Sequence, residues 1–341
     1  MLANHLNDLM RGLLLLTITV SAFAANAQNG KRYFAKDSVE IFYTKEELAI
    51  KLPDNLMPII DCPMRDAAIS RGPDSTYYLT GTTGYPDWWN LTSDIKVWKS
   101  KDLKSWVPVV EKPRLRATVW NVDREGTEGQ RKGTIRKGEF FRPVWAPEIN
   151  YVKNNFWLTF CIPGWGNTIL KSTTGRPEGP YINALANDVP LNTQIDASLF
   201  EDEDGKVYSV VGAGIVTPLK DDLSGASGPS KLAKPANAKH VGFEGAFLFK
   251  ANGKYHMAAA EFVNGDYHCF VASADKIYGP YGNRYLAIPH GGHNTFFKDN
   301  EGNWWSTFFG NSRNYSKIKE KPVILRVVFD EHGHIKPLMQ D

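Results

Sequence analysis

Five segments of the chain repeat one pattern, a turn followed by a strand rich in aromatic residues. The strands are expected to begin at Thr76, Asn155, Lys206, Lys254 and Asn303. Their starts are separated by 79, 51, 48 and 49 residues, and the first gap contains an insertion of about thirty residues. This period fits the four-stranded blades of a β-propeller and is too long for ankyrin or tetratricopeptide repeats. The repeat predicts an all-β fold, a five-bladed β-propeller with four-stranded blades around a central axis.

A side chain of chemical interest stands ten residues before each of these strands. The five positions hold Asp66, Trp145, Asp196, Glu244 and His293. Equivalent positions of propeller blades are arranged around one axis, so these side chains are expected to face a common pocket.

Three of the five positions carry acids. Each acid alone has a structural interpretation: Asp66 in an ion pair, Asp196 capping a turn, or Glu244 as a charge on an edge strand. Crowded like charges raise one another's pKa and cost stability, so a structural scaffold gains little from aiming three acids at one axis. Glycoside hydrolysis needs carboxyl groups with different pKa values, because one must protonate the leaving oxygen while another stays ionised to act on water. The register therefore favours an enzyme.

Aromatic side chains near the acids are typical of a sugar pocket. Trp145 shares the register of the acids. Phe243 directly precedes Glu244, and Trp88 and Trp89 follow the first aromatic strand. Their rings could stack on the apolar face of a sugar, although tryptophan is more often core filler, and for Trp88 and Trp89 both interpretations stay open. Arg326 could contact an acidic sugar or pair with surface carboxylates.

The segments that hold these residues resemble glycoside hydrolase family 43, whose members are inverting five-bladed propeller enzymes, and the resemblance spans residues 59–338. The matching segments are Met64-Arg65-Asp66, Trp145-Ala146-Pro147-Glu148-Ile149, Ile195 to Phe200, Phe243-Glu244-Gly245 and Gly292-His293-Asn294. The resemblance implies that Asp66 is the general base, Glu244 the general acid, and Asp196 the residue that tunes the pKa of Glu244. It implies no required cofactor, but it admits a structural calcium ion at His293, held through water.

Proline commonly follows each acid in the family, whereas this chain has Ala67, Ala197 and Ala246. This departure marks an unusual subgroup. It weakens the inference of substrate specificity from the family more than the inference of residue roles. The resemblance implies plant-type polysaccharides or oligosaccharides as substrates, with α-L-arabinofuranosyl or β-D-xylosyl linkages first and galactosyl linkages third. The alternative is a non-catalytic carbohydrate-binding propeller, which needs the aromatic pocket but has no use for three acids in register.

Charge and the N-terminal residues bear on partners and location. A net charge of +3 on 341 residues, without a basic run interleaved with aromatics, argues against a nucleic-acid partner. Arg11, the apolar run Gly12 to Ala24 and then Ala25-Asn26-Ala27 predict a signal peptide over residues 1–27. Since no other run approaches ~20 apolar residues, we expect an exported protein, periplasmic or secreted, without a membrane segment after cleavage. A monomer whose partner is a carbohydrate is expected.

The repeat also predicts how the chain is divided into domains. Residues 56–341 are predicted to form one propeller domain, and residues 28–55 to contribute to ring closure, with Tyr33 to Tyr43 pairing with the last strands. The polar insertion between Glu111 and Glu139 is expected to form a surface loop beside the pocket mouth.

Cysteine and histidine spacing argues against a metal framework. Cys62, Cys161 and Cys269 lack the spacing of a disulfide or zinc framework, so they are expected to be buried small apolar residues. The glycines between His290 and His293 indicate a turn instead of a zinc site.

Overall fold

The structure is a computed structural model. It describes residues 47, 49–88, 92–110, 117–133, 135–136, 139–140, 144–263, 266–310 and 318–339. The chain divides into two compact units, residues 1–42 with 262–266 and residues 43–261 with 267–341. The second unit contains the candidate site and the sheets, except for strand residues 262, 263 and 266. The predicted signal peptide and the predicted closing segment from Tyr33 to Tyr43 lie outside the described residues.

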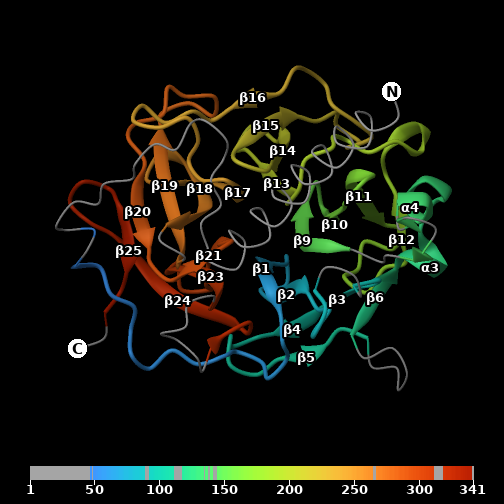
Figure 1. The fold of residues 1–341 in the computed structure, drawn as a ribbon, viewed down its shortest axis with the longest axis horizontal. Helices are drawn as coiled ribbons and strands as arrows, with labels where there is room; N and C mark the ends of the chain where they lie inside the picture. Colours follow the sequence, from blue (N-terminus) through green and yellow to red (C-terminus); the bar gives the residue numbers. More distant parts are fainter. Residues whose placement is uncertain are drawn as a thin grey trace, which may run out of the picture. The chain divides into compact units, whose positions relative to one another are not determined.

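Five antiparallel sheets are arranged around a central point (Figure 1). Four of them have four strands, and in each the strands pair side by side in the order in which they follow along the chain. The strands, sheet by sheet, are β1 (Arg65–Arg71), β2 (Tyr77–Thr82), β4 (Trp98–Ser100) and β5 (Val107–Pro108); β9 (Trp145–Val152), β10 (Asn155–Ile162), β11 (Gly166–Ser172) and β12 (Tyr181–Asn183); β13 (Ser198–Glu201), β14 (Val207–Val211), β15 (Ile215–Pro218) and β16 (Lys231–Leu232); β17 (Glu244–Ala251), β18 (Lys254–Val263), β19 (Asp266–Ala274) and β20 (Tyr285–Ile288); and β21 (Gly291–Gly292), β22 (Phe296–Lys298), β23 (Trp304–Gly310), β24 (Pro322–Phe329) and β25 (Ile335–Pro337). The predicted five-bladed propeller is confirmed.

The repeated aromatic strands are the second strands of the blades. β10 and β18 begin at the predicted residues, and β2, β14 and β23 begin one residue later. Every residue of β2 and of β14 is buried. A strand covered on both faces is continuously apolar instead of alternating, which is why this part of each repeat is the easiest to read in the sequence.

The innermost strands begin with an unusual backbone conformation. A left-handed residue is the second residue of such a strand or lies up to three residues before it, at the register position or one residue after it. The five are Asp66, Ala146, Asp196, Gly245 and His293, with φ between 45° and 62°. Strand pairing is irregular between Arg65 and Ala68 and between Glu244 and Phe247. Left-handed non-glycine residues are uncommon, and a bulge at the end of a strand re-aims its side chains. The predicted register therefore has a counterpart in the backbone.

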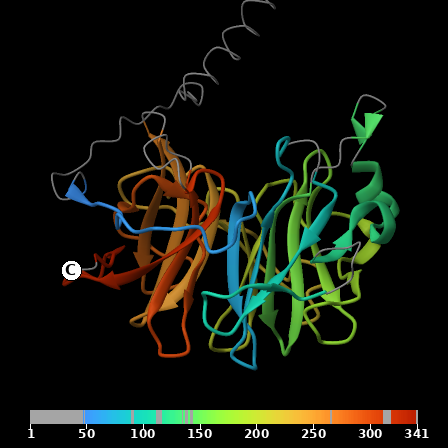
Figure 2. The same ribbon diagram turned by 90° about the horizontal axis from the view of Figure 1, so that it is seen from below.

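The first and fifth blades are joined by hydrogen bonds. The Thr307 hydroxyl donates to the Ala67 carbonyl at 2.7 Å. The amide of Ile69 donates to the Thr295 hydroxyl at 3.2 Å, and the amide of Met64 donates to the Glu320 carbonyl at 2.9 Å. These bonds close the ring within the described residues. Figure 2 shows the first strand of the first blade, in blue, between the red strands of the last blade and the green strands of the second.

The insertion after the first blade is folded. It contains β6 (Thr118–Asn121), which pairs with β3 (Asp94–Lys96), then α3 (Val122–Glu125), α4 (Glu128–Gly133), β7 (Ile135–Arg136) and β8 (Glu139–Phe140). Trp120 is 1% exposed, and its ring centroid lies 4.8 Å from that of Phe160 in the second blade. The prediction of a polar surface loop is thus wrong for residues 117–133, because the apolar run around Trp120 adds to the core. A short 3-10 helix, η1 (Ala186–Asp188), follows β12.

The three cysteines are free. Cys161 and Cys269 are buried as predicted, whereas Cys62 is half-buried, so that prediction is wrong for Cys62. Among the residues with a described conformation, no helix is long and apolar enough to cross a bilayer.

Candidate active site

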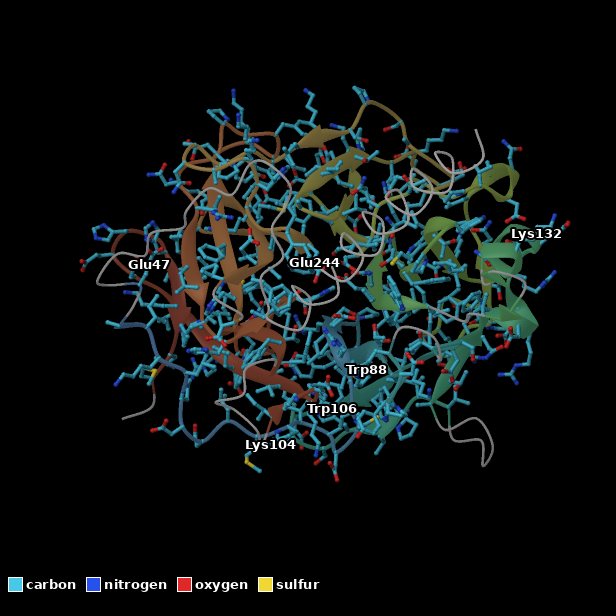
Figure 3. All side chains as sticks on the ribbon, viewed as in Figure 1. Glu47, Trp88, Lys104, Trp106, Lys132 and Glu244 are labelled. Carbon is cyan, nitrogen blue, oxygen red and sulfur yellow. The ribbon has the colours of Figure 1, made fainter. Side chains whose placement is uncertain are left out.

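Three acids from three blades meet in one cluster near the centre of the ring, where Figure 3 labels Glu244. Two buried side chains, Cys161 and Tyr267, are close enough to be affected by all three acids. The charges of Asp66, Asp196 and Glu244 all raise the pKa of the Cys161 thiol and of the Tyr267 hydroxyl, after the larger effect of burial. Coulombic interactions fall with distance, so groups that sense all three acids lie among them.

Asp66 is held from two sides. The Thr82 hydroxyl donates to Asp66 Oδ2 at 2.7 Å, and His293 Nδ1 lies 3.2 Å from Asp66 Oδ1. The side chain of His293 is 7% exposed and that of Asp66 is 18% exposed. Asp66 is therefore fixed in orientation while part of its carboxylate stays open to water, as a base that acts on water requires.

Glu244 is set up to hold a proton. Burial, followed by the negative charges of Asp196 and Asp66, raises its pKa, while His293 and the hydrogen bond from Tyr267 act in the opposite direction. The Tyr267 hydroxyl donates to Glu244 Oε1 at 3.1 Å. This bond occupies one carboxyl oxygen and leaves Oε2 to carry the proton.

Asp196 connects the acids through the backbone. Its Oδ2 accepts a hydrogen bond from the amide of Gly245 at 3.0 Å, and the aspartate is 8% exposed. Burial and the charge of Asp66 raise its pKa. Gly245 has a φ of 62°, and a Cβ at this position would come within 3.0 Å of the His293 ring. Only glycine fits here, and Asp196 in turn fixes the residue that follows Glu244.

Two substitutions should shift the alkaline limb of kcat/KM in opposite directions. That limb follows loss of the proton from the general acid of the free enzyme. Asp196→Asn removes a charge that raises the pKa of Glu244, so the limb should move to lower pH. Tyr267→Phe removes a hydrogen bond that lowers this pKa, so the limb should move to higher pH. Complete pH profiles of both variants test this, and shifts in the same direction would contradict the assignment of Glu244.

Glu148 is a fourth acid beside the cluster, and it was not among the predicted site residues. It is 7% exposed on β9. Burial raises its pKa to about 7, opposed by the neighbouring Ser198, His293 and Asn150 side chains. Glu148 belongs to the Trp145 to Ile149 segment, but it lies outside the ten-residue register that identifies the other acids.

Glu148→Gln is expected to stabilise the protein at alkaline pH. With a pKa of about 7 in the folded state and an ordinary value of 4.5, Glu148 loses its proton later in the folded state than in the unfolded state. Its contribution to stability therefore falls as pH rises from 4.5 to 7 and stays low above that range. The free energy of unfolding of the variant minus that of the unmodified protein should be roughly 1–3 kcal/mol larger at pH 8 than at pH 4.5, so the variant is the more stable protein at pH 8. Urea titrations at both pH values measure the difference, and a pH-independent difference would contradict it.

The other predicted site residues are placed differently. Trp145 starts β9, and its carbonyl accepts from the Cys161 thiol at 3.8 Å, beside the acids. Phe243 precedes Glu244, and its ring lies edge-on to Tyr267 with centroids 6.5 Å apart. Trp88 is 5% exposed, which favours a packing role. Trp89 lies outside the described residues.

The structure does not bring Arg326 to the acids. Arg326 is on β24, where Nη2 donates to Asn303 Oδ1 at 2.6 Å and the guanidinium lies 6.0 Å from the centre of the Trp305 ring. Asn303 ends the turn after β22, at the end of the fifth blade opposite to His293.

The residues around His293 do not fit a directly coordinated calcium ion. Calcium takes six to eight oxygen ligands, and His293 Nδ1 already contacts Asp66. The described part of the chain has no group of three or more histidine, cysteine, aspartate or glutamate side chains that could hold a metal.

Comparisons with known proteins agree with this geometry. The family model described as glycosyl hydrolases family 43 matches residues 56–335. A β-D-galactofuranosidase of Aspergillus niger is 25% identical over 226 residues, which cover 58% of this chain and 65% of that protein. A xylosidase/arabinosidase of Humicola insolens is 26% identical over 254 residues, 67% of this chain and 42% of that protein. The chain thus matches less than two thirds of the length of these relatives.

Solved structures share the fold. An α-L-arabinofuranosidase of Clostridium thermocellum superposes with a TM-score of 0.61 at 19% identity, over 82% of this chain and 95% of that one. An endo-1,4-β-xylanase of Bacteroides thetaiotaomicron gives a TM-score of 0.61 at 21% identity, over the same shares of the two chains. At these identities the likeness is one of architecture.

Proposed function

Since the chain belongs to glycosyl hydrolases family 43, we propose that it is an inverting glycoside hydrolase that cleaves plant-type polysaccharides or their oligosaccharides. The observation that carries the proposal is the division of roles within one cluster. Burial and neighbouring charge keep Glu244 protonated, while Asp66 is held by Thr82 and His293 with part of its carboxylate accessible.

The proposed reaction uses both carboxyl groups in one step. Asp66 takes a proton from a water molecule as that water attacks the anomeric carbon. Glu244 gives its proton to the glycosidic oxygen as the bond from this oxygen to the anomeric carbon breaks. Attack from the face opposite to the leaving group inverts the anomeric configuration. The products leave Asp66 protonated and Glu244 ionised, and exchange with solvent restores both.

The proposed sugars are α-L-arabinofuranose or β-D-xylose, with galactose as a third choice. The names of the relatives, which include a xylosidase/arabinosidase and a β-D-galactofuranosidase, support this set of sugars and do not rank them. Hydrolysis of arabinan, xylan, galactan and matching aryl glycosides tests the substrate class. Proton NMR of the first-formed anomer tests the stereochemistry, and net retention would exclude the mechanism. Glycan binding without hydrolysis across the panel would support a carbohydrate-binding propeller instead.

We propose that no metal takes part in the reaction, because the two carboxyl groups account for every proton transfer. A calcium ion held through water at His293 would have a structural role only. Dialysis against EDTA should therefore leave kcat unchanged, and any effect of calcium should be confined to the midpoint of thermal unfolding. A loss of kcat that calcium restores would contradict this assignment.

We further propose that the protein is exported and acts as a monomer. The apolar run from Gly12 to Ala24, followed by small residues, supports export. Sequencing the N-terminus of the protein recovered outside the cytoplasm tests cleavage after Ala27, and analytical ultracentrifugation tests the oligomeric state.

A further inference from the structure

A pocket of about 180 Å³ adjoins the acid cluster between the second and third blades. Its lining includes Cys161 and Ile195, and Ile195 directly precedes Asp196. The pocket therefore shares a wall with the acids. Its volume is about six times the ~30 Å³ that a water molecule occupies in the liquid, which suits one ring-sized group.

One wall of the pocket is an ordered loop that presents polar side chains. Thr193 and Gln194 line the pocket and are exposed. The loop is held from below by Asn167, which is fully buried and whose Nδ2 donates to Asn192 Oδ1 and to the Gln194 carbonyl, both at 2.7 Å. The amide of Asn167 also donates to the Asn192 carbonyl at 2.9 Å. A hydroxyl and an amide on a loop fixed in this way are suited to the hydroxyl groups of a sugar.

The facing wall is aromatic. Trp165 lines the pocket from the turn between β10 and β11, and its amide donates to the Ile162 carbonyl at 2.9 Å. An indole ring beside polar groups is a common surface for the apolar face of a sugar.

The insertion supports Trp165 from behind. Gly129 and Gly133 are four residues apart in α4 and so lie on one face of that helix. A Cβ on Gly129 would come within 2.9 Å of Trp165 Nε1, and one on Gly133 within 2.5 Å of Trp165 Cβ. The amide of Gly129 donates to Asp188 Oδ2 at 2.8 Å, which ties α4 to the end of the second blade. Glycine at both positions allows the helix to pack directly against the indole, and Figure 1 shows α4 beside this blade.

We infer that this pocket is a subsite for a second sugar of the substrate, with Trp165 as the stacking surface and Thr193 and Gln194 as hydrogen-bonding partners. The inference rests on the proposed function and extends it. The preferred substrates are then oligosaccharides or branched chains. The folded insertion contributes to substrate specificity, because α4 holds Trp165 in position.

The test compares one aryl monoglycoside with oligosaccharides of two to five units of the same sugar. Trp165→Ala should lower kcat/KM for the oligosaccharides by about 10-fold or more, which corresponds to about 1.4 kcal/mol. The loss on the oligosaccharides should exceed the loss on the monoglycoside at least fivefold. Trp165→Phe should recover most of the activity, and Gly133→Val, which displaces the indole from the side of α4, should reproduce the effect of Trp165→Ala. Trp106→Ala removes a tryptophan from the first blade and should leave the ratio unchanged.

Binding separates this inference from the proposed function. With Glu244→Gln as the background, calorimetry should show that Trp165→Ala weakens oligosaccharide binding by about the same factor. Absence of hydrolysis by the unmodified protein would refute the proposed function, and the binding comparison would still decide on the pocket. Equal losses on the monoglycoside and the oligosaccharides, no loss on either, or unchanged affinity would overturn the subsite.

Discussion

Replacing Glu244 with glutamine is expected to lower kcat by about 10²–10⁴-fold on natural glycosides, the range that general acid catalysis supplies. The amide has nearly the shape of the carboxyl group and can still accept from Tyr267, but it has no acidic proton to give to the leaving oxygen. The loss should depend on the leaving group. Natural sugars are poor leaving groups that need protonation, whereas a dinitrophenolate leaves without it.

A series of aryl glycosides with leaving groups of graded acidity measures this dependence. For Glu244→Gln, log kcat should rise steeply with leaving-group acidity and approach that of the unmodified enzyme at the most acidic member. Circular dichroism and the unfolding midpoint serve as controls for the fold. A uniform loss across the series would assign Glu244 to another role.

Asp66→Asn is expected to cause a loss of similar size that does not depend on the leaving group. Without a carboxylate near the attacking water, the water keeps its proton in the transition state whichever group departs. The fall in kcat should therefore be nearly constant across the same aryl series. Asp61→Asn is the matched control, because the Asp61 side chain is 91% exposed and pairs with Lys321 at 2.6 Å, outside the cluster.

Together the two variants distinguish the acid from the base within one set of substrates. If Asp66→Asn were rescued by acidic leaving groups in the way expected for Glu244→Gln, the roles would be reversed. If neither variant lost activity, the cluster would not be the reaction centre.

The sequence predicted the fold and the meeting point of the acids for a definite reason. Equivalent positions in a rotationally repeated structure share one radius and height, so a register read along the chain becomes a ring in space. The same register does not describe which side chains of different strands contact each other within a blade. Tyr267 is 23 residues from Glu244 and carries no repeat signal, and its hydrogen bond depends on the rotamers of both side chains.

Other parts of the site were hidden for related reasons. Glycine commonly marks a left-handed backbone, but Asp66, Asp196 and His293 adopt that conformation without it, so their turns gave no signal. The insertion has no repeat to be compared with, and its polar composition masked the few apolar residues that fold it. Trp165 packs against α4 on one side and lines the pocket on the other. Both neighbours come from separate segments of the chain, so the sequence around Trp165 does not predict its role.

The contact between Asp66 and His293 spans the first and the last blade, and it lies beside the hydrogen bonds that close the ring. During synthesis, a nascent chain that has completed four blades already contains all three acids but lacks the histidine that orients the base. A chain that ends before the fifth blade therefore lacks the contact that holds Asp66 in the complete ring.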